Sequence, residues 1–356
     1  MQLKIGIILT NITKRAGIER AVVNLSNILS NLGYQVFILS SDSEMGTSAY
    51  NLNKNVEILH LGLHISGIQS IMKTKEYFLL YTKLIQIRKK KKINVFIGTE
   101  CIYNFLISFI SKIKTIGCEH FNYEYSGSFK NFLKKFFYKK LDSVVLLTET
   151  DKKNYNFLVN TCVIPNSLSF SPSKISDCET KRIISLGRLT YQKGYDLLIE
   201  SINLIKDKLN GWIVEIYGSG EDRAKLEDKI SYHSLNDIIR LKEPIADVEN
   251  LFYSSSIFLS SSRFEGFSLV ILESQSCGVP AVVFDCPCGP AEIVINDRTG
   301  FVVDLYDVHN FSQKILELVD NEQLRKEFGK NAHIEANRFS TSNISLKWAE
   351  LFERIL

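Results

Sequence analysis

The sequence lacks the short motifs that hold metal ions or nucleoside triphosphates in many enzymes. Its 356 residues contain no GxxxxGK[ST] phosphate loop, no Asp-x-Asp pair and no CxxC pair, and the histidines do not cluster. The stretch YGSGED is not a full GxGxxG dinucleotide fingerprint, because Arg223 stands at the third glycine position. These absences argue against an ATPase and weaken the case for a dinucleotide enzyme. They predict a site with no metal and no bound cofactor.

Long hydrophobic runs are also missing. The apolar run Leu3–Leu9 contains a lysine and is too short for a signal peptide. The run Ile102–Ile110 is broken by two polar residues and falls far short of the roughly 20 residues of a membrane-spanning helix. We therefore expect a cytoplasmic protein, in which the seven scattered cysteines are reduced thiols.

Positive charge is concentrated in the first half of the chain. Residues 1–165 hold 22 Lys and Arg against 11 Asp and Glu, a net charge of +11, whereas residues 166–356 hold 21 against 28, a net charge of −7. Within residues 128–143, lysines lie between apolar residues that recur near helical spacing, as in a basic amphipathic helix. These apolar residues are Phe129, Phe132, Phe136, Phe137 and Leu141. Two interpretations stay open: a packed helix whose lysines are solvated, or a helix that lies on an anionic membrane surface.

Strand and helix patterns alternate along the chain and restart near its middle. The first half predicts strands at 4–9, 35–40, 95–98, 115–118 and 144–147, with a helix at 18–32. The second half predicts strands within 182–188, 212–217, 257–259 and 281–284. Alternating strands and helices are typical of α/β folds with parallel sheets. We expect Rossmann-like domains at 1–165 and 166–339 that face across a ligand-binding cleft, and a helix at 340–356 that crosses back onto the first domain.

A basic turn follows the first strand of the second half. Arg188 lies on this turn, and Lys193 comes just before a predicted helix start. Two cations and the N–H groups of a helix start favour an anion such as a diphosphate. The alternative is a basic turn that only caps the helix.

Two glutamates flank an apolar stretch in RFEGFSLVILE, residues 263–273. Glu265 is predicted on a loop, whereas Glu273 lies more than one turn inside a helix predicted from 269 to 277 with Ser268 as its N-cap. A partly buried carboxylate needs hydrogen-bond donors, and a ribose diol would supply them. The alternative for Glu273 is an ordinary glutamate on the surface of a helix.

Taken together, these stretches resemble the retaining glycosyltransferases of family 4, which have the two-domain GT-B fold. The matching stretches span nearly the whole chain: AGIERAVVNL, EHFNY, VIPNS, GRLTYQKGYDLLIES, YGSGED and SRFEGFSLVILESQSCGVPAVVFD. The family usually has two glycines where this chain has Ala16-Gly17.

The resemblance implies roles for individual residues around a sugar nucleotide. It places Glu273 on the ribose, Arg188 and Lys193 on the diphosphate, and Glu265 on the hydroxyls of the donor sugar. Further residues implied to contact the donor are Gly17 from the first domain, and Gly266, Phe267 and Ser268 at the helix start. His120 is implied to lie near the donor sugar, where a polar side chain can stabilise developing charge. The alternative without a functional role for His120 is a packed histidine at the end of a strand.

The resemblance also implies substrates. The loop FDCPCGPAEI is similar to a loop of members that add galactose or an N-acetylhexosamine to bacterial surface polysaccharides such as capsule and O-antigen, with Ala291 in place of the usual serine. It implies a UDP-sugar donor, a polyprenyl-diphosphate-linked saccharide acceptor, a metal-independent reaction and a location at the inner face of the cytoplasmic membrane; nucleic acid is not an expected partner. Two rivals remain, a UDP-sugar 2-epimerase of the same fold and a non-catalytic sugar-nucleotide-binding assembly subunit.

Overall fold

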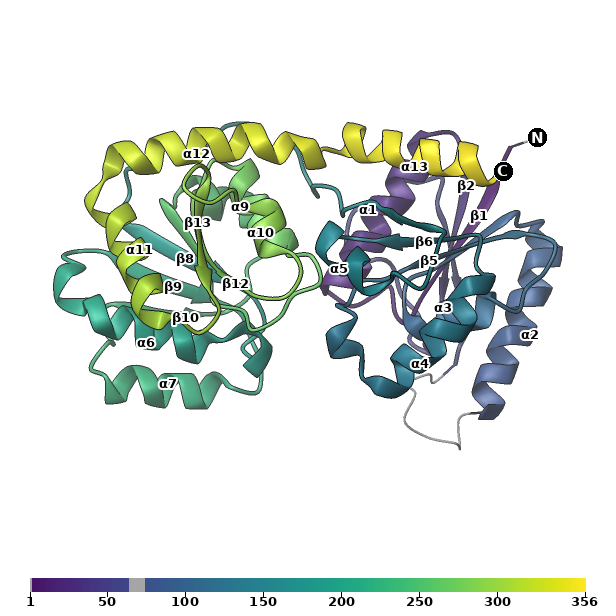
Figure 1. The fold of residues 1–356 in the computed structure, drawn as a ribbon, viewed down its shortest axis with the longest axis horizontal. Helices are drawn as coiled ribbons and strands as arrows, with labels where there is room; N and C mark the ends of the chain where they lie inside the picture. Colours follow the sequence, from purple (N-terminus) through teal and green to yellow (C-terminus); the bar gives the residue numbers. More distant parts are fainter. Residues whose placement is uncertain (1, 64–73) are drawn as a thin grey trace. The chain divides into compact units, whose positions relative to one another are not determined.

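The chain forms two compact α/β units. The computed structural model describes residues 2–63 and 74–356. One unit comprises Met1–Ser169 and Thr341–Leu356, and the other comprises Phe170–Ser340. The expected boundaries at 165/166 and 339/340 lie close to these divisions. Figure 1 shows that each unit is built of strands covered by helices.

The first unit has a parallel sheet on which both faces are covered. Among its described residues the sheet has seven strands in the spatial order β3-β2-β1-β4-β5-β6-β7. The strands are β1 (Lys4–Leu9), β2 (Gln35–Ser40), β3 (Glu57–His60), β4 (Val95–Gly98), β5 (Lys114–Cys118), β6 (Ser143–Leu146) and β7 (Thr161–Val163). The helices are α1 (Gly17–Asn31), α2 (Thr74–Lys91), α3 (Cys101–Ile107), α4 (Ser128–Phe137), α5 (Glu149–Asn154) and α13 (Thr341–Ile355), with short 3-10 turns η2 (Glu124–Ser126) and η3 (Tyr138–Lys140).

Successive side chains of β1 point to opposite faces of the sheet and so enter different cores. Ile5 and Ile7 pack in a core with residues of α1 and α13. Ile8 packs in a second core with residues of α2, α3 and the segment after α4. A strand buried on both faces reads as a continuous apolar run, which is why β1 was predictable from the sequence.

The helix α13 belongs to the first unit. It packs along α1 (Figure 1), where Trp348 and Phe352 are almost fully buried. The ring of Phe352 also contacts Tyr34 edge to face, with the centroids 5.3 Å apart. The last residues of the chain therefore complete the core of the unit that contains the first.

The second unit, residues 170–340, lies wholly within the described part of the chain. Its six-stranded parallel sheet has the order β10-β9-β8-β11-β12-β13. The strands are β8 (Arg182–Leu186), β9 (Ile213–Tyr217), β10 (Ile239–Lys242), β11 (Ile257–Ser260), β12 (Ala281–Asp285) and β13 (Gly300–Asp304). The helices are α6 (Tyr195–Ile205), α7 (Arg223–Tyr232), α8 (Val248–Tyr253), α9 (Leu269–Ser276), α10 (Pro290–Ile293), α11 (Val308–Asp320) and α12 (Glu322–Ala336), with 3-10 turns η4 (Tyr191–Lys193), η5 (Lys206–Lys208) and η6 (Asn337–Phe339).

The sequence did not predict the outermost strand at either edge of either sheet. These strands are β3, β7, β10 and β13. An edge strand pairs on one side only, and β3 and β7 have no fully buried residue. Without a buried run, neither strand carries the apolar signal that identified the central strands.

We expect Trp348→Ala to destabilise the first unit. Removing a buried indole leaves a cavity between α13 and α1, so the free energy of unfolding should fall by about 3–5 kcal/mol. Urea unfolding followed by circular dichroism measures this change. Leu346→Ala on the same helix is the control, because Leu346 is 61% exposed and its loss should cost little. Equal effects of the two substitutions would contradict the packing described for α13.

Candidate active site

The predicted donor-binding residues of the second unit gather where its sheet changes direction. From β8 the strand order runs outward through β9 to β10 on one side, and through β11 to β13 on the other. Open α/β sheets bind ligands beyond the carboxyl ends of the strands at such a switch point. Arg188 and Lys193 follow β8, and Glu265 follows β11.

Lys193 and Glu265 form an ion pair at this point. The ammonium of Lys193 lies 2.6 Å from Oε1 of Glu265, and the hydroxyl of Ser262 donates to the same oxygen at 2.7 Å. Both side chains are mostly buried, with 17% of Lys193 and 8% of Glu265 exposed. Charge-assisted hydrogen bonds of this length are strong, so the pair fixes the position of both groups.

Two glycines allow this close approach. A Cβ on Gly187 would lie 2.9 Å from Cε of Lys193, so the lysine side chain crosses the turn where a larger residue would block it. Gly194 has a left-handed backbone (φ +62°), and a Cβ there would lie 2.1 Å from the carbonyl oxygen of Ser261. The turn before α6 can therefore lie directly on the loop after β11.

Arg188 differs from Lys193 in exposure. Its side chain is exposed, and its guanidinium donates to Oε1 of Gln192 at 3.2 Å. Of the two predicted diphosphate ligands, Arg188 is the solvent-accessible cation, whereas Lys193 is held by a carboxylate.

The start of α9 lies beside the same loop. Phe267 and Ser268 are buried just before the helix, and Gly289 packs against them, with its would-be Cβ 3.4 Å from Cα of Phe267. Ser268 occupies the N-cap position, but in the described structure its side chain makes no capping hydrogen bond. The expected capping role is therefore wrong, because the side chain lines a small cavity with Tyr195 and Lys193 instead.

Glu273 lies inside α9 and is 1% exposed. The sequence predicted partial burial, and the structure places this residue deeper than that. The helix is buried on nearly every side, since α9 packs against β11, β12 and α12. Glu273 is therefore not an ordinary glutamate on a helix surface.

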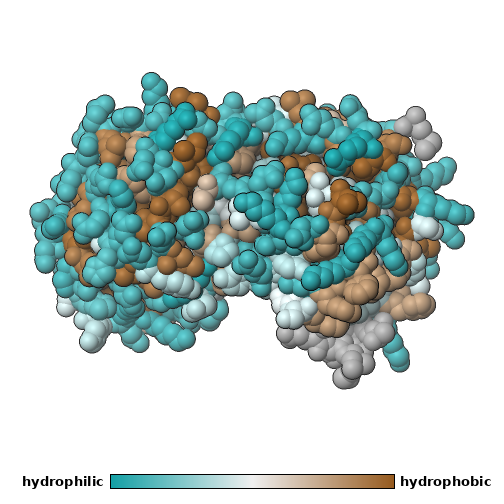
Figure 2. Space-filling model, in the orientation of Figure 1, coloured by the Kyte–Doolittle hydropathy of each residue, from teal (hydrophilic) through white to brown (hydrophobic). Residues whose placement is uncertain are grey.

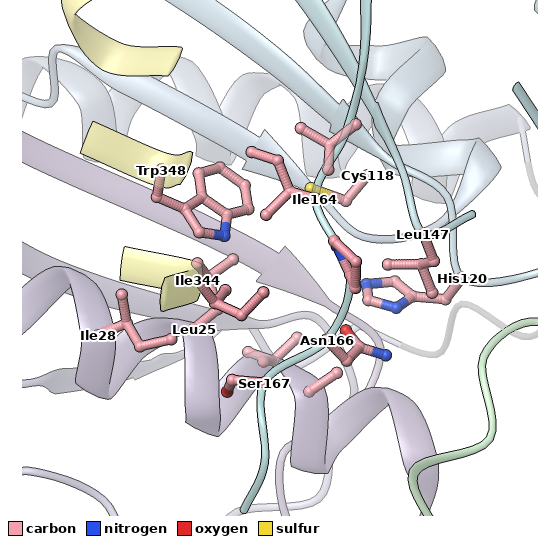
Figure 3. Close-up of a pocket in the computed structure, with 14 residues that line it drawn as sticks. Leu25, Ile28, Cys118, His120, Leu147, Ile164, Asn166, Ser167, Ile344 and Trp348 are labelled. Atoms are coloured by element: carbon pink, nitrogen blue, oxygen red, sulfur yellow. The ribbon is translucent and has the colours of Figure 1, made fainter. Parts of the chain in front are cut away.

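The first unit contains two of the predicted donor-binding residues. His120 follows β5, and Gly17 is the first residue of α1. Burial lowers the pKa of His120 to about 4, although the charge of Glu119 acts in the opposite direction. The imidazole is therefore neutral at pH 7. Figure 3 shows its ring beside Asn166 and Leu147 at a small cavity that Trp348 also lines. A Cβ on Gly17 would meet nothing within 4 Å, so the loop before α1 leaves open space there.

Sequence reasoning missed a buried ion pair next to His120. Lys134 in α4 is fully buried, and its ammonium lies 2.7 Å from Oε2 of Glu119. Lys134 also donates to the hydroxyls of Ser126 and Tyr155, each at 2.9 Å. The interpretation of 128–143 as a packed helix whose lysines are all solvated does not hold for Lys134, which lies on the inner side of α4.

A second missed carboxylate lies at the switch point of the first sheet, between β1 and β4. Oε1 of Glu100 accepts hydrogen bonds from the backbone N–H and the hydroxyl of Thr10, at 3.1 and 2.6 Å. Burial raises the pKa of Glu100, which these bonds partly oppose. Its place directly after a buried strand was the available signal in the sequence.

The outer side of α4 is aromatic and basic. Phe129, Phe132 and Phe136 are 63%, 56% and 60% exposed, whereas Leu141 packs into the core. Figure 2 shows apolar side chains gathered at the lower right, where Figure 1 places α3 and α4. Lys140 lies over the ring of Phe109, 4.9 Å from its centroid. The apolar residues of 128–143 are thus divided between the core and this exposed aromatic face.

The described residues contain neither a cluster of metal-ligating side chains nor a membrane-spanning helix. Within residues 2–63 and 74–356, no group of three or more His, Cys, Asp or Glu side chains could hold a metal ion. No helix in the same ranges is both long and apolar enough to cross a membrane. The seven cysteines are all free.

Comparison with known proteins identifies relatives over the full length of the chain. Residues 170–334 match the family model described as "Glycosyl transferases group 1". The chain is 29% identical over 360 residues to the amylovoran biosynthesis glycosyltransferase AmsD of Erwinia amylovora, covering 98% of this chain and 99% of that protein. It is 28% identical over 242 residues to a poly(ribitol-phosphate) alpha-N-acetylglucosaminyltransferase of Staphylococcus aureus (strain COL), covering 65% of this chain and 48% of that protein.

The fold is similar to that of a solved structure of S. aureus TarM that contains UDP. The TM-score is 0.82 at 17% sequence identity, and the match covers 99% of this chain and 100% of that one. A match at this identity shows the shared fold, and the family model and AmsD add the shared activity. The chain is therefore a glycosyltransferase of the GT-B fold, and its residues 170–334 are similar to the group 1 glycosyl transferases.

Proposed function

We propose that the chain is a retaining transferase that moves galactose or an N-acetylhexosamine from a UDP-sugar to a polyprenyl-diphosphate-linked saccharide in bacterial surface polysaccharide synthesis. The observation that carries this proposal is the Lys193–Glu265 pair, at 2.6 Å, at the switch point of the second sheet. The names of the relatives support it: one acts in amylovoran biosynthesis, and another transfers alpha-linked N-acetylglucosamine. The UDP in the TarM structure supports the choice of nucleotide.

The chemistry follows from the charges at this point. Cleavage of the bond between the sugar and the diphosphate leaves negative charge on the phosphate, and a preorganised cation stabilises that charge. Lys193 is held rigidly by Glu265 and acts on the leaving group, while Arg188 supplies a second, exposed cation. The backbone N–H groups of Phe267 and Ser268, at the start of α9, donate to the same anion. These groups balance the diphosphate charge without a metal ion.

Glu265 holds the sugar rather than reacting with it. The carboxylate of Glu265 accepts hydrogen bonds from sugar hydroxyls, while the ion pair with Lys193 keeps it oriented. A neutral His120 can donate to one hydroxyl and accept from another. In a front-face reaction, the leaving phosphate accepts the proton of the incoming acceptor hydroxyl, so no protein nucleophile is required.

The acceptor explains the aromatic and basic surface of the first unit. A polyprenyl-linked saccharide stays in the membrane, so its transferase must work at the membrane surface. Exposed phenylalanines can enter the lipid interface, and lysines are attracted to anionic headgroups. The exposed lysines of this surface are Lys130, Lys135, Lys139 and Lys140. We assign the exposed side of α4 to contact with the inner face of the cytoplasmic membrane.

We expect Lys193→Met to lower kcat for UDP-sugar turnover by about 100-fold or more, because it removes a cation that stabilises the leaving diphosphate. UDP release from UDP-galactose and UDP-N-acetylglucosamine, with lipid-linked acceptor and without it, measures the change. Lys229→Met is the matched control, since Lys229 forms an ion pair with Glu200 on the helices of the same unit, away from the switch point.

The same assay distinguishes a transferase from the two alternative functions, a UDP-sugar 2-epimerase and a non-catalytic sugar-nucleotide-binding subunit. Isomerisation of the donor with no acceptor present would identify an epimerase. Tight UDP binding without turnover would identify a non-catalytic binder. Full activity of Lys193→Met, Glu265→Ala and Arg188→Ala would overturn the site assignment.

His120 should titrate near pH 4 in the folded protein. Its pKa is lowered from the ordinary 6.5 by burial, so the unfolded chain binds the proton more readily. The contribution of this group to stability is complete above pH 6.5 and is lost as the pH falls toward 4. NMR of histidine-labelled protein, with the signal assigned by its loss in His120→Gln, gives the midpoint. A midpoint near 6.5 would mean that the imidazole is not desolvated.

The triple substitution of Phe129, Phe132 and Phe136 by Ser should weaken binding to phosphatidylglycerol vesicles. Sedimentation with these vesicles and with phosphatidylcholine vesicles measures binding, and added salt should weaken it because the lysines contribute through their charge. Tyr232→Ser is the control, since Tyr232 is 84% exposed on the second unit. If the wild-type protein does not bind phosphatidylglycerol vesicles, the assignment of this surface to membrane contact is wrong.

A further inference from the structure

We propose that Arg263 is a positioning residue that locks the turn 191–196 onto the loop 261–265 and thereby sets the geometry of the Lys193–Glu265 pair. The inference rests on the proposed function, because it assigns Arg263 to the same donor site.

Arg263 is buried, and its guanidinium donates hydrogen bonds to one segment. Only 6% of the residue is exposed. Nη1 and Nη2 donate to the two carboxylate oxygens of Asp196, at 2.9 and 2.6 Å, in the forked arrangement that arginine favours. Nη1 also donates to the carbonyl oxygen of Tyr191 at 2.7 Å. The side chain of Arg263 thus forms hydrogen bonds with both ends of the turn, at Tyr191 and at Asp196.

A backbone hydrogen bond and a cation–π contact of Arg263 also join the loop to the turn. The backbone N–H of Arg263 donates to the carbonyl oxygen of Gln192 at 2.8 Å. The guanidinium carbon lies 4.1 Å from the ring centroid of Tyr191, within the range of a cation–π contact. Burial by itself would raise the pKa of Asp196, but the hydrogen bonds and charge of Arg263 outweigh it and lower that pKa. Asp196 therefore stays ionised and the fork stays charged.

Other bonds join the same two segments. The side chain of Gln192 donates to the carbonyl oxygen of Phe264 at 3.1 Å, and the hydroxyl of Ser261 donates to the carbonyl oxygen of Lys193 at 3.0 Å. Lys193 lies in the middle of the clamped turn, and Glu265 lies two residues after Arg263. The distance between the ammonium and the carboxylate is therefore set by how tightly the two segments are held together.

The planar guanidinium of Arg263, and not only its positive charge, is needed to hold the two segments together. A lysine at position 263 would keep one positive charge but could not donate to both oxygens of Asp196 and to Tyr191 in the same planar arrangement. A shift of about 1 Å in a catalytic group can cost about 100-fold in rate. Because Arg263 is buried and committed to protein partners, its effect on the donor acts through Lys193 and Glu265 and not by contact.

Arg182 offers a matched structural control in the same unit. It begins β8, at the opposite end of the strand from the switch point, and its Nε and Nη2 lie 2.7 and 2.6 Å from Oε2 of Glu215. Its other bonds reach the hydroxyls of Ser254 and Tyr217, each at 2.7 Å. Arg182→Lys therefore disturbs a similar network that has no contact with the donor residues.

The test compares Arg263→Lys with Arg182→Lys. Melting temperature, UDP affinity by calorimetry, and kcat and KM for UDP-galactose and UDP-N-acetylglucosamine are measured for each. We expect similar losses of melting temperature, but a kcat about 100-fold lower for Arg263→Lys and nearly unchanged for Arg182→Lys. In the Arg263→Lys background, Lys193→Met should cost less than about tenfold, because the lysine that it removes is already misplaced.

Other results would contradict either the role of Arg263 or the proposed function. Equal kinetic effects of the two arginine substitutions, or additive effects of Arg263→Lys and Lys193→Met, would reduce Arg263 to a structural residue while leaving the proposed function intact. A wild-type protein that neither binds UDP nor turns over UDP-sugars would overturn the proposed function, and the role of Arg263 with it.

Discussion

In both units every strand pairs in parallel with its neighbours, and the candidate site depends on this constraint. Parallel pairing brings the carboxyl ends of the strands to one edge of the sheet, so that residues far apart in the sequence meet there. In the second sheet the edge between β8 and β11 collects Lys193 and Glu265, which are 72 residues apart. In the first sheet the edge between β1 and β4 collects Thr10 and Glu100, which are 90 residues apart.

Three cations near these edges are each paired with a carboxylate, which offsets the cost of removing a charge from water. Lys193 faces Glu265, Arg263 faces Asp196, and Lys134 faces Glu119. An ion pair of this kind contributes little net stability, but removal of one partner leaves an uncompensated charge. What the pairs supply is fixed geometry, which a site that stabilises a leaving group requires.

The helix α4 serves two surfaces at once. On its inner side, Lys134 holds Glu119, the residue before His120. On its outer side, the rings of Phe132 and Phe136 contact each other at an interplanar angle of 49°, with their centroids 4.8 Å apart, and remain exposed. The same helix therefore contacts the residue before His120 on one side and presents exposed aromatic rings on the other.

The sequence by itself determined the fold class, the central strands and the order of the elements, because fully buried strands read as continuous apolar runs. Its motifs also indicated Lys193 and Glu265 as candidate site residues, but they did not show that the two contact each other. Tertiary structure alone decided that Lys134 is buried, that Ser268 does not cap α9 and that Arg263 joins two loops. Each of these depends on which residues of distant segments come within hydrogen-bond distance, and no local pattern of apolar and polar residues encodes that distance.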